Sequence, residues 1–194
     1  MKKQYRYNHE LMSVLPQILQ LTNYEFLKRI GRTNTLLKNC NERKDIRVKW
    51  LVDICNEFHI SISHFFCEGA SKKTIPAKLF RDNPVFSPIS FESERISDMC
   101  SGMIPGLSVK QLVEEMKISN IMYYNWINPE KETIYAGDLA RLCNRYELSP
   151  MYFFEDANAK DNNLMDVDMY IQSLLLENRR LKERVYELEQ LIQK

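Results

Sequence analysis

Apolar residues recur in this chain with the spacing of α-helices, and one stretch of the pattern occurs twice. Residues 51–66 read LVDICNEFHISISHFF, and residues 139–154 read LARLCNRYELSPMYFF. In each copy the first apolar positions are spaced i, i+3, i+4 and i+7, which is typical of a helix with one buried face. The matching positions are Leu51, Ile54, Cys55 and Phe58 in one copy and Leu139, Leu142, Cys143 and Tyr146 in the other. A repeat of this length predicts one folding unit present twice.

The duplication extends upstream through two helix-start signals. Thr22 with Glu25, and Ser108 with Gln111, have the spacing of a capping box. In a capping box the hydroxyl accepts from the third helical N–H, and the acid or amide reaches back to the N–H of the cap residue. Two helices are therefore expected to begin at equivalent places.

Breakers and polar runs divide the chain into three parts. Pro76, Pro84 and Pro88 predict a linker that is not a continuous helix, and the polar stretch 155–163 predicts a second boundary. The expected units are a first module over 1–75, a linker with a second module over 76–160, and a segment over 161–194. Strand-like alternation is essentially absent, so we predict an all-α fold: two tandem five-helix modules followed by a C-terminal coiled-coil helix. The last helix of each module is short and capped by Ser61 or Ser149.

Each module resembles a helix-turn-helix domain of the Xre/lambda-repressor type. In module one the turn is Ile30-Gly31-Arg32, where Gly31 suits a backbone that needs positive φ, and the recognition helix is expected over about 33–39. In module two the turn is Lys117-Ile118, and the recognition helix is expected over about 119–127. The resemblance covers most of residues 1–160 and implies binding to double-stranded DNA through the third helix of a module.

Module one fits this function better than module two. The family usually has Gln after the capping residue of helix two; Asn23 hydrogen-bonds similarly, whereas Val109 does not. Glu114 and Glu115 precede the recognition helix of module two, and acidic groups repel the phosphate backbone. Residues 1–75 carry a net charge of +6, residues 76–160 carry −3 and residues 161–194 carry −2. Module two is therefore a candidate for altered DNA contact or for binding a protein partner or effector.

The resemblance, together with the clustered cations, suggests a DNA-binding set. Asn or Arg side chains near a helix N-terminus read base edges, and Lys or Arg bind phosphates. Our base-reading candidates are Arg32, Thr33, Asn34 and Lys38. The phosphate candidates are Lys28, Arg29, Arg43, Lys44 and Arg47, with Asn23 beside them and with Asn120 and Tyr124 in module two. The alternative is that these charges form an ordinary solvated face.

The C-terminal segment has a heptad repeat. The a positions are Leu164, Ile171, Asn178, Val185 and Ile192, and the d positions are Val167, Leu174, Leu181 and Leu188. β-Branched residues at a with Leu at d favour a parallel two-stranded coil, and one Asn at an a position fixes register. This pattern predicts a parallel homodimer; the alternative is an amphipathic helix that folds back on its own module.

Catalytic chemistry has little support in the sequence. His59, His64 and Cys67, together with Cys55, are candidate metal ligands. However, the counterpart of Cys55 in the repeat is Cys143, which lies on an apolar helix face, and metal sites need three or four convergent ligands. We expect no enzyme activity, no cofactor, no metal and no membrane segment. We expect a cytoplasmic transcription regulator that binds a pseudo-palindromic operator as a homodimer. The competing hypothesis is an adaptor that uses degenerate modules and the coiled coil for protein assembly.

Overall fold

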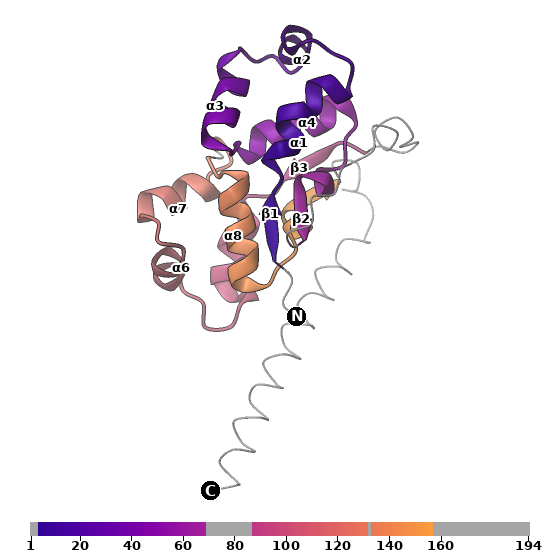
Figure 1. Ribbon diagram of the computed structural model, residues 1–194. Helices are drawn as coiled ribbons and strands as arrows, with labels where there is room; N and C mark the ends of the chain where they lie inside the picture. The colour runs from indigo at the N-terminus through magenta and orange to yellow at the C-terminus, as the bar shows by residue number, and fades with distance from the viewer. Residues whose placement is uncertain (1–3, 69–86, 132, 157–194) are drawn as a thin grey trace, which may run out of the picture.

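The computed structural model describes residues 4–68, 87–131 and 133–156, and these residues repeat one order of elements twice (Figure 1). The first half contains β1 (Tyr5–Tyr7), α1 (His9–Ile18), α2 (Asn23–Arg29), α3 (Thr35–Arg43), α4 (Val48–Phe58), the 3-10 helix η1 (Ile62–Phe65) and β2 (Phe66–Glu68). The second half contains β3 (Ile89–Phe91), α5 (Glu94–Asp98), the π-helical turn η3 (Met99–Met103), α6 (Val109–Met116), α7 (Asn120–Ile127), α8 (Ala136–Tyr146), the 3-10 helix η4 (Pro150–Phe153) and β4 (Phe154–Asp156). The predicted duplication is thus visible in the order of elements.

The prediction of an all-α fold is wrong, because each half opens and closes with a strand. β1 pairs antiparallel with β2, and β3 pairs antiparallel with β4. Each strand is three residues long, too short for the alternation of a half-buried strand to stand out in the sequence. The closing helices end at Phe65 and Phe153, and the residues that follow, Phe66 and Phe154, begin strands.

Both predicted capping boxes are present. The N–H of Glu25 donates to the Thr22 hydroxyl at 3.2 Å, and the Thr22 N–H donates to the Glu25 carboxylate at 2.9 Å. In the second half, the corresponding distances between Ser108 and Gln111 are 3.3 Å and 2.9 Å. These reciprocal bonds satisfy backbone donors that the first turn of a helix leaves unpaired. They fix the starts of α2 and α6 at equivalent places.

The turns after α2 and α6 share one backbone conformation despite different residues. Gly31 has φ of 63°, and Lys117, its counterpart, has φ of 53°. The left-handed region carries no steric cost for glycine but a real one for a side chain with a Cβ. The positive φ expected at Gly31 is therefore present, and module two adopts it without the glycine.

The first and third helices of module one are well defined. α1 begins at His9, where the Asn8 side chain accepts from the Leu11 N–H at 3.2 Å, and Pro16 lies inside the helix. α3 runs on to Arg43, beyond the predicted end at residue 39, because Cys40 adds a buried position one turn after Leu36.

The two halves pack together about a pseudo-two-fold axis. The N–H of Val48 donates to the carbonyl of Ile134 at 2.9 Å, and the N–H of Ala136 donates to the carbonyl of Ile46 at 2.8 Å. Val48 and Ala136 are counterparts in the repeat, as are Ile46 and Ile134, so the exchange is reciprocal. Between them, Arg47 and Tyr135 form an isolated antiparallel bridge. The axis therefore passes between the residues that precede α4 and α8.

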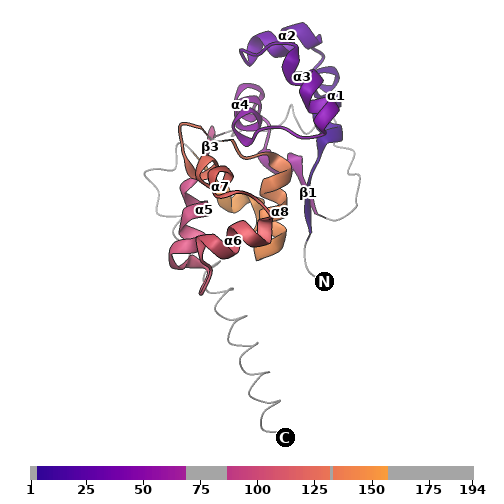
Figure 2. The same cartoon turned by 90° about the vertical axis from the view of Figure 1, so that its left-hand side faces the viewer.

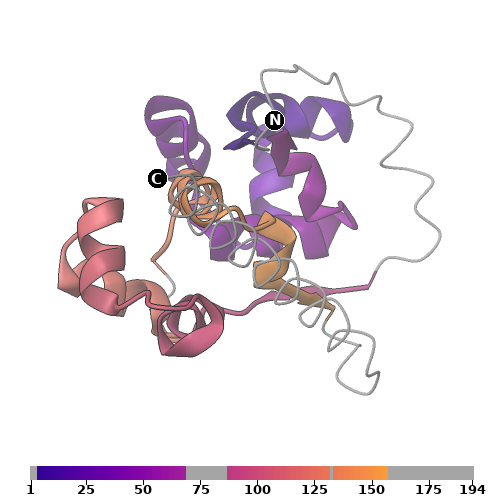
Figure 3. The same cartoon turned by 90° about the horizontal axis from the view of Figure 1, so that it is seen from below.

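A continuous core joins the halves. Buried side chains of both belong to one apolar cluster that runs from Tyr7 to Phe154. The Phe66 ring, which ends the first repeat, lies 6.1 Å from that of Phe154, which ends the second. Figure 3 shows the indigo-to-purple half and the pink-to-orange half lying against one another. The strands that contradict the all-α prediction thus also contribute to the contact between the modules.

Among the described residues, no helix combines the length and the apolar character that crossing a membrane requires. The predicted coiled coil over 161–194, with its a and d positions, lies outside the described residues.

Candidate nucleic-acid interface

In module one, the N-terminal half of α3 presents a polar, solvent-exposed face. Leu36 and Cys40 point into the core, which leaves Thr33, Asn34 and Thr35 exposed at the start of the helix. Asn34 occupies the N-cap position, but its side chain makes no capping hydrogen bond. One turn on, the Lys38 side chain is 72% exposed and lies 3.9 Å from Glu42. Three of the four predicted base-reading residues therefore lie together on one accessible surface.

The fourth base-reading candidate, Arg32, is held against its own module. Its guanidinium donates to the Asp53 carboxylate at 2.7 Å and lies over the Trp50 ring, 5.5 Å from the centroid. These contacts tie the α2–α3 turn to α4. Arg32 thus has a structural role that sequence reasoning missed.

Arg29, a predicted phosphate ligand, is also engaged within the module. It pairs with Glu57 at 2.8 Å, and its guanidinium lies 4.6 Å from the centre of the Phe58 ring. Asn23 and Lys28 are exposed on α2. The cationic surface around α3 therefore depends more on Lys28 and Lys38 than on the arginines.

Of the three remaining phosphate candidates of module one, Arg43 and Arg47 lie where the modules meet. Arg43 donates to the Tyr135 hydroxyl at 3.0 Å, and Arg47 lies over the Trp50 ring at 4.9 Å, beside the pseudo-two-fold axis. Lys44 ends α3 in a left-handed conformation with φ of 54° and is exposed. Arg43 and Arg47 link the positions of the two modules, a role that the charge pattern alone did not indicate.

Module two presents the matching face with different chemistry. Tyr123 and Trp126 of α7 are buried, and Ser119 caps the helix by accepting from the Met122 N–H at 3.1 Å. Asn120 is exposed, Ile121 is 74% exposed and Tyr124 is 60% exposed. In the repeat, Asn120, Ile121 and Tyr124 correspond to Asn34, Thr35 and Lys38. The two faces share the asparagine and differ at the other two positions.

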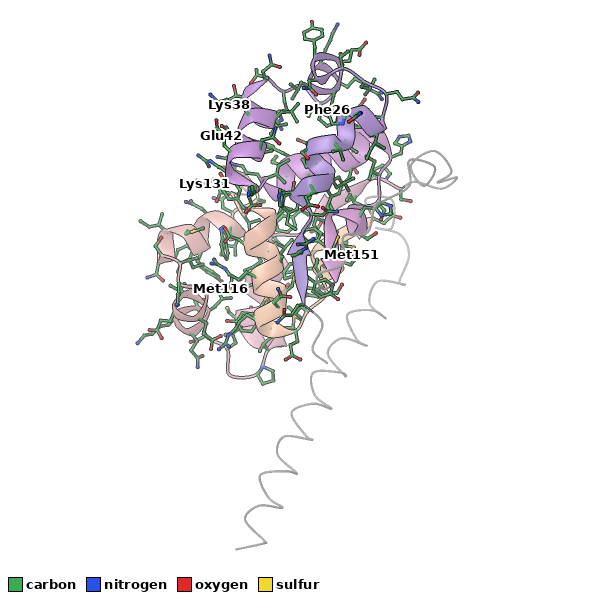
Figure 4. The ribbon with its side chains drawn as sticks, viewed as in Figure 1. Phe26, Lys38, Glu42, Met116, Lys131 and Met151 are labelled. Atoms are coloured by element: carbon green, nitrogen blue, oxygen red, sulfur yellow. The ribbon has the colours of Figure 1, made fainter. Side chains whose placement is uncertain are left out.

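The pseudo-two-fold relation places both faces on one side of the molecule. Figure 1 shows α3 and α7 at the same edge, and Figure 2, which views that edge directly, shows α3 above α7. Figure 4 places Lys38, Glu42 and Lys131 along this side. Both recognition faces are therefore open to the same side of the molecule.

The charges around α7 are mixed. Lys117 and Lys131 are exposed, and the Lys131 ammonium donates to the Asn125 side chain at 3.2 Å. Glu115 is bound by Arg145 and by the Tyr146 hydroxyl, at 2.8 Å and 2.9 Å. The hydrogen bond from Arg145 is the main cause that holds the pKa of Glu115 below its ordinary value. The repulsion expected from Glu115 is thus partly offset, whereas Glu114 remains exposed.

The cysteines in the described part of the chain are free, and three of them are buried. Cys40, Cys55 and Cys143 are buried, and burial raises the pKa of the Cys40 thiol to about 11. Within residues 4–68, 87–131 and 133–156, no three His, Cys, Asp or Glu side chains gather closely enough to hold a metal ion.

Comparison of the chain with protein-family models, with curated proteins and with solved structures found no significant match. The proposed function therefore rests on the geometry and chemistry of the site and on the resemblance of residues 1–160 to helix-turn-helix domains.

Proposed function

We propose that this protein binds double-stranded DNA in a sequence-dependent way and regulates transcription in the cytoplasm. It is the role that the resemblance to Xre/lambda-repressor helix-turn-helix domains implies. One observation carries the proposal. Two capped helices, each followed by a left-handed turn and a helix with an exposed N-terminal face, are presented on one side of the molecule about a pseudo-two-fold axis.

The chemistry of α3 supports this role. DNA-binding helices place their N-terminal residues against base edges in the major groove, and Asn pairs with adenine through both its amide atoms. Asn34 is exposed at that end of α3 and makes no capping bond. Lys28, which is exposed on α2, supplies affinity for phosphates. The proposed base readers are Thr33, Asn34 and Lys38.

Dimerisation through the C-terminal heptads remains part of the proposal. The pseudo-two-fold axis already gives one chain two recognition faces, those of α3 and α7, so a dimer would carry four. The homodimer would then increase avidity for neighbouring sites rather than supply the two-fold symmetry of a single site.

Fluorescence anisotropy with the full chain and a labelled duplex of random sequence tests the proposal. We expect binding whose logarithmic affinity falls linearly with the logarithm of salt concentration, because phosphate contacts release counterions. The variant Lys28→Ala should flatten this slope by roughly one. Arg141→Ala, an exposed cation on α8 outside both helix–turn–helix units, should leave the slope unchanged. A wild-type protein that shows no binding at low salt would overturn the proposal.

One observation favours the competing role of a protein adaptor. Ile121 and Tyr124 expose large apolar side chains beside one another on α7, and exposed apolar surface is common at protein interfaces. Under this alternative, module two binds a protein, and substitutions on α7 leave DNA binding unaltered.

A further inference from the structure

We infer that one chain reads two unlike DNA half-sites in inverted orientation, with α3 on one and the Asn120–Ile121–Tyr124 face of α7 on the other. The inference rests on the proposed function and deepens it by naming the ligand: an inverted pair that shares one adenine position and differs elsewhere.

The first step is the rigidity of the pair. Among the described residues, six hydrogen bonds cross the module contact in reciprocal fashion. Two join the backbones of residues 46–48 and 134–136, and four join the Asn56 amide to Ile89 and the Asn144 amide to Tyr5. The modules also share one apolar core. A duplex that lies on α3 is therefore met by α7 in a fixed, two-fold related position.

The second step is the direction of the half-sites. A pseudo-two-fold axis turns one recognition face into the other by a half-rotation, and the strands of a DNA duplex are related by the same operation. Two related faces on one side of a protein consequently read an inverted repeat, not a direct one. Asn34 and Asn120 occupy matching positions, so each should read an adenine at the matching place in its half-site.

The third step is the difference between the halves. Where α3 has Thr35 and Lys38, α7 has Ile121 and Tyr124, which are 74% and 60% exposed. Apolar side chains recognise the thymine methyl group in the major groove, whereas Lys recognises guanine. The half-site under α7 should therefore contain thymines where the half-site under α3 contains guanine.

The charges agree with this division. The cations near α7 are offset by Glu114, and Glu115 already binds Arg145. Module two thus contributes little phosphate affinity of its own. Its contribution to the complex is discrimination between bases, while module one supplies most of the salt-dependent attraction.

Selection from random double-stranded DNA by the full chain tests the inference. The wild-type protein should enrich an inverted repeat with unlike halves. In the double variant Ile121→Thr, Tyr124→Lys, the α7 face takes on the residues of α3, so the selected site should become a symmetric palindrome. The reverse variant, Thr35→Ile with Lys38→Tyr, should change only the other half. All four positions are exposed, so the fold should not depend on them.

A second readout tests the methyl contact directly. Replacing thymine by uracil in the α7 half-site removes only the methyl group, and each lost contact should weaken wild-type binding roughly fourfold, the equivalent of one buried methylene. Ile121→Ala, Tyr124→Ala should bind thymine and uracil sites equally. The inference fails if the wild-type protein selects only a single half-site. It also fails if the wild-type protein selects a symmetric palindrome and the α7 variants select the same palindrome. The proposed function fails, separately, if the folded wild-type protein enriches no sequence at all.

Discussion

Asn56 and Asn144 occupy the same position in the two repeats, and each hydrogen-bonds with the first strand of the other module. The Asn56 amide donates to the carbonyl of Ile89 and accepts from its N–H, both at 2.9 Å. The Asn144 amide makes the same pair of bonds with Tyr5, at 2.7 Å and 2.6 Å. An identical residue in a repeat thus marks the contact between the repeats.

Replacing either asparagine by alanine should loosen that contact. Each substitution leaves one backbone N–H and one carbonyl of a partly buried strand without their partner, which costs about 1–3 kcal/mol in the free energy of unfolding. Urea denaturation measures the loss. The control Asn41→Ala changes an exposed residue of α3 and should shift stability by less than about 0.5 kcal/mol. If Asn56→Ala and Asn144→Ala both unfold at the wild-type urea concentration, the contact does not hold the modules together.

The turns after α2 and α6 offer a reciprocal stability test. Lys117 adopts φ of 53°, a conformation that costs a residue with a Cβ about 1 kcal/mol relative to glycine. Lys117→Gly should therefore raise the thermal midpoint, and Gly31→Lys should lower it. No atom lies within 4 Å of a Cβ built on Gly31, so the penalty there comes from the backbone alone. Equal midpoints for both variants and the wild type would contradict the shared turn geometry.

Asp45 links a buried carboxyl to the module contact. It accepts from its own neighbour Ile46 and from the N–H of Gly137 at 3.0 Å, and burial raises the pKa of its carboxyl above the ordinary 3.8. A folded-state pKa above the unfolded value means that the stability from this group is fully present below about pH 3.8. That stability is lost as pH rises through the folded pKa.

Asp45→Asn should remove this pH dependence, because the amide oxygen accepts the same two N–H groups without carrying charge. We expect the variant to be more stable than the wild type at pH 7 and to lose that advantage as pH falls below 3.8. Unfolding by urea across this range gives the comparison. An advantage that grows toward low pH would show that Asp45 stabilises the fold as a carboxylate.

Arg32 should behave as a structural residue. Its ion pair with Asp53 joins side chains that are 35% and 41% exposed, so solvent screens part of the attraction. Arg32→Ala should reduce stability by up to about 1 kcal/mol, and Asp53→Ala should reduce it similarly. In a double-mutant cycle the two losses should not add, because they remove one interaction. A change in the selected DNA sequence with unchanged stability would instead restore Arg32 as a base reader.

The sequence predicted the local structure of this protein better than its assembly. Capping boxes, the glycine turn and the repeated apolar spacing are local signals, and α2, α6, α4 and α8 form where those signals lie. The three-residue strands form because distant segments meet. The alternation of apolar and polar residues over three positions is too short to be recognised in a sequence. The roles of Arg32 and Arg43 were missed for the same reason, since their partners, Asp53 and Tyr135, lie in other segments of the chain.

The candidate site was predicted in part. The exposed asparagines follow from the repeat, because Asn34 and Asn120 match and neighbouring apolar residues define the buried side of each helix. Ile121 was not singled out, because an apolar residue in a helix usually indicates core. Only the burial of Tyr123 and Trp126 shows that Ile121 faces outward.

The spacing between the two half-sites tests the central claim most directly. Fluorescence anisotropy measures the affinity of the protein for two duplexes. One carries the selected site, and the other carries the same site with five base pairs inserted between the halves. Five base pairs turn one half-site by about half a helical turn, so rigidly joined modules cannot contact both halves. We expect affinity to fall to that of a duplex carrying only the α3 half-site. Equal affinity for both duplexes would show that the modules bind independently and would contradict the account.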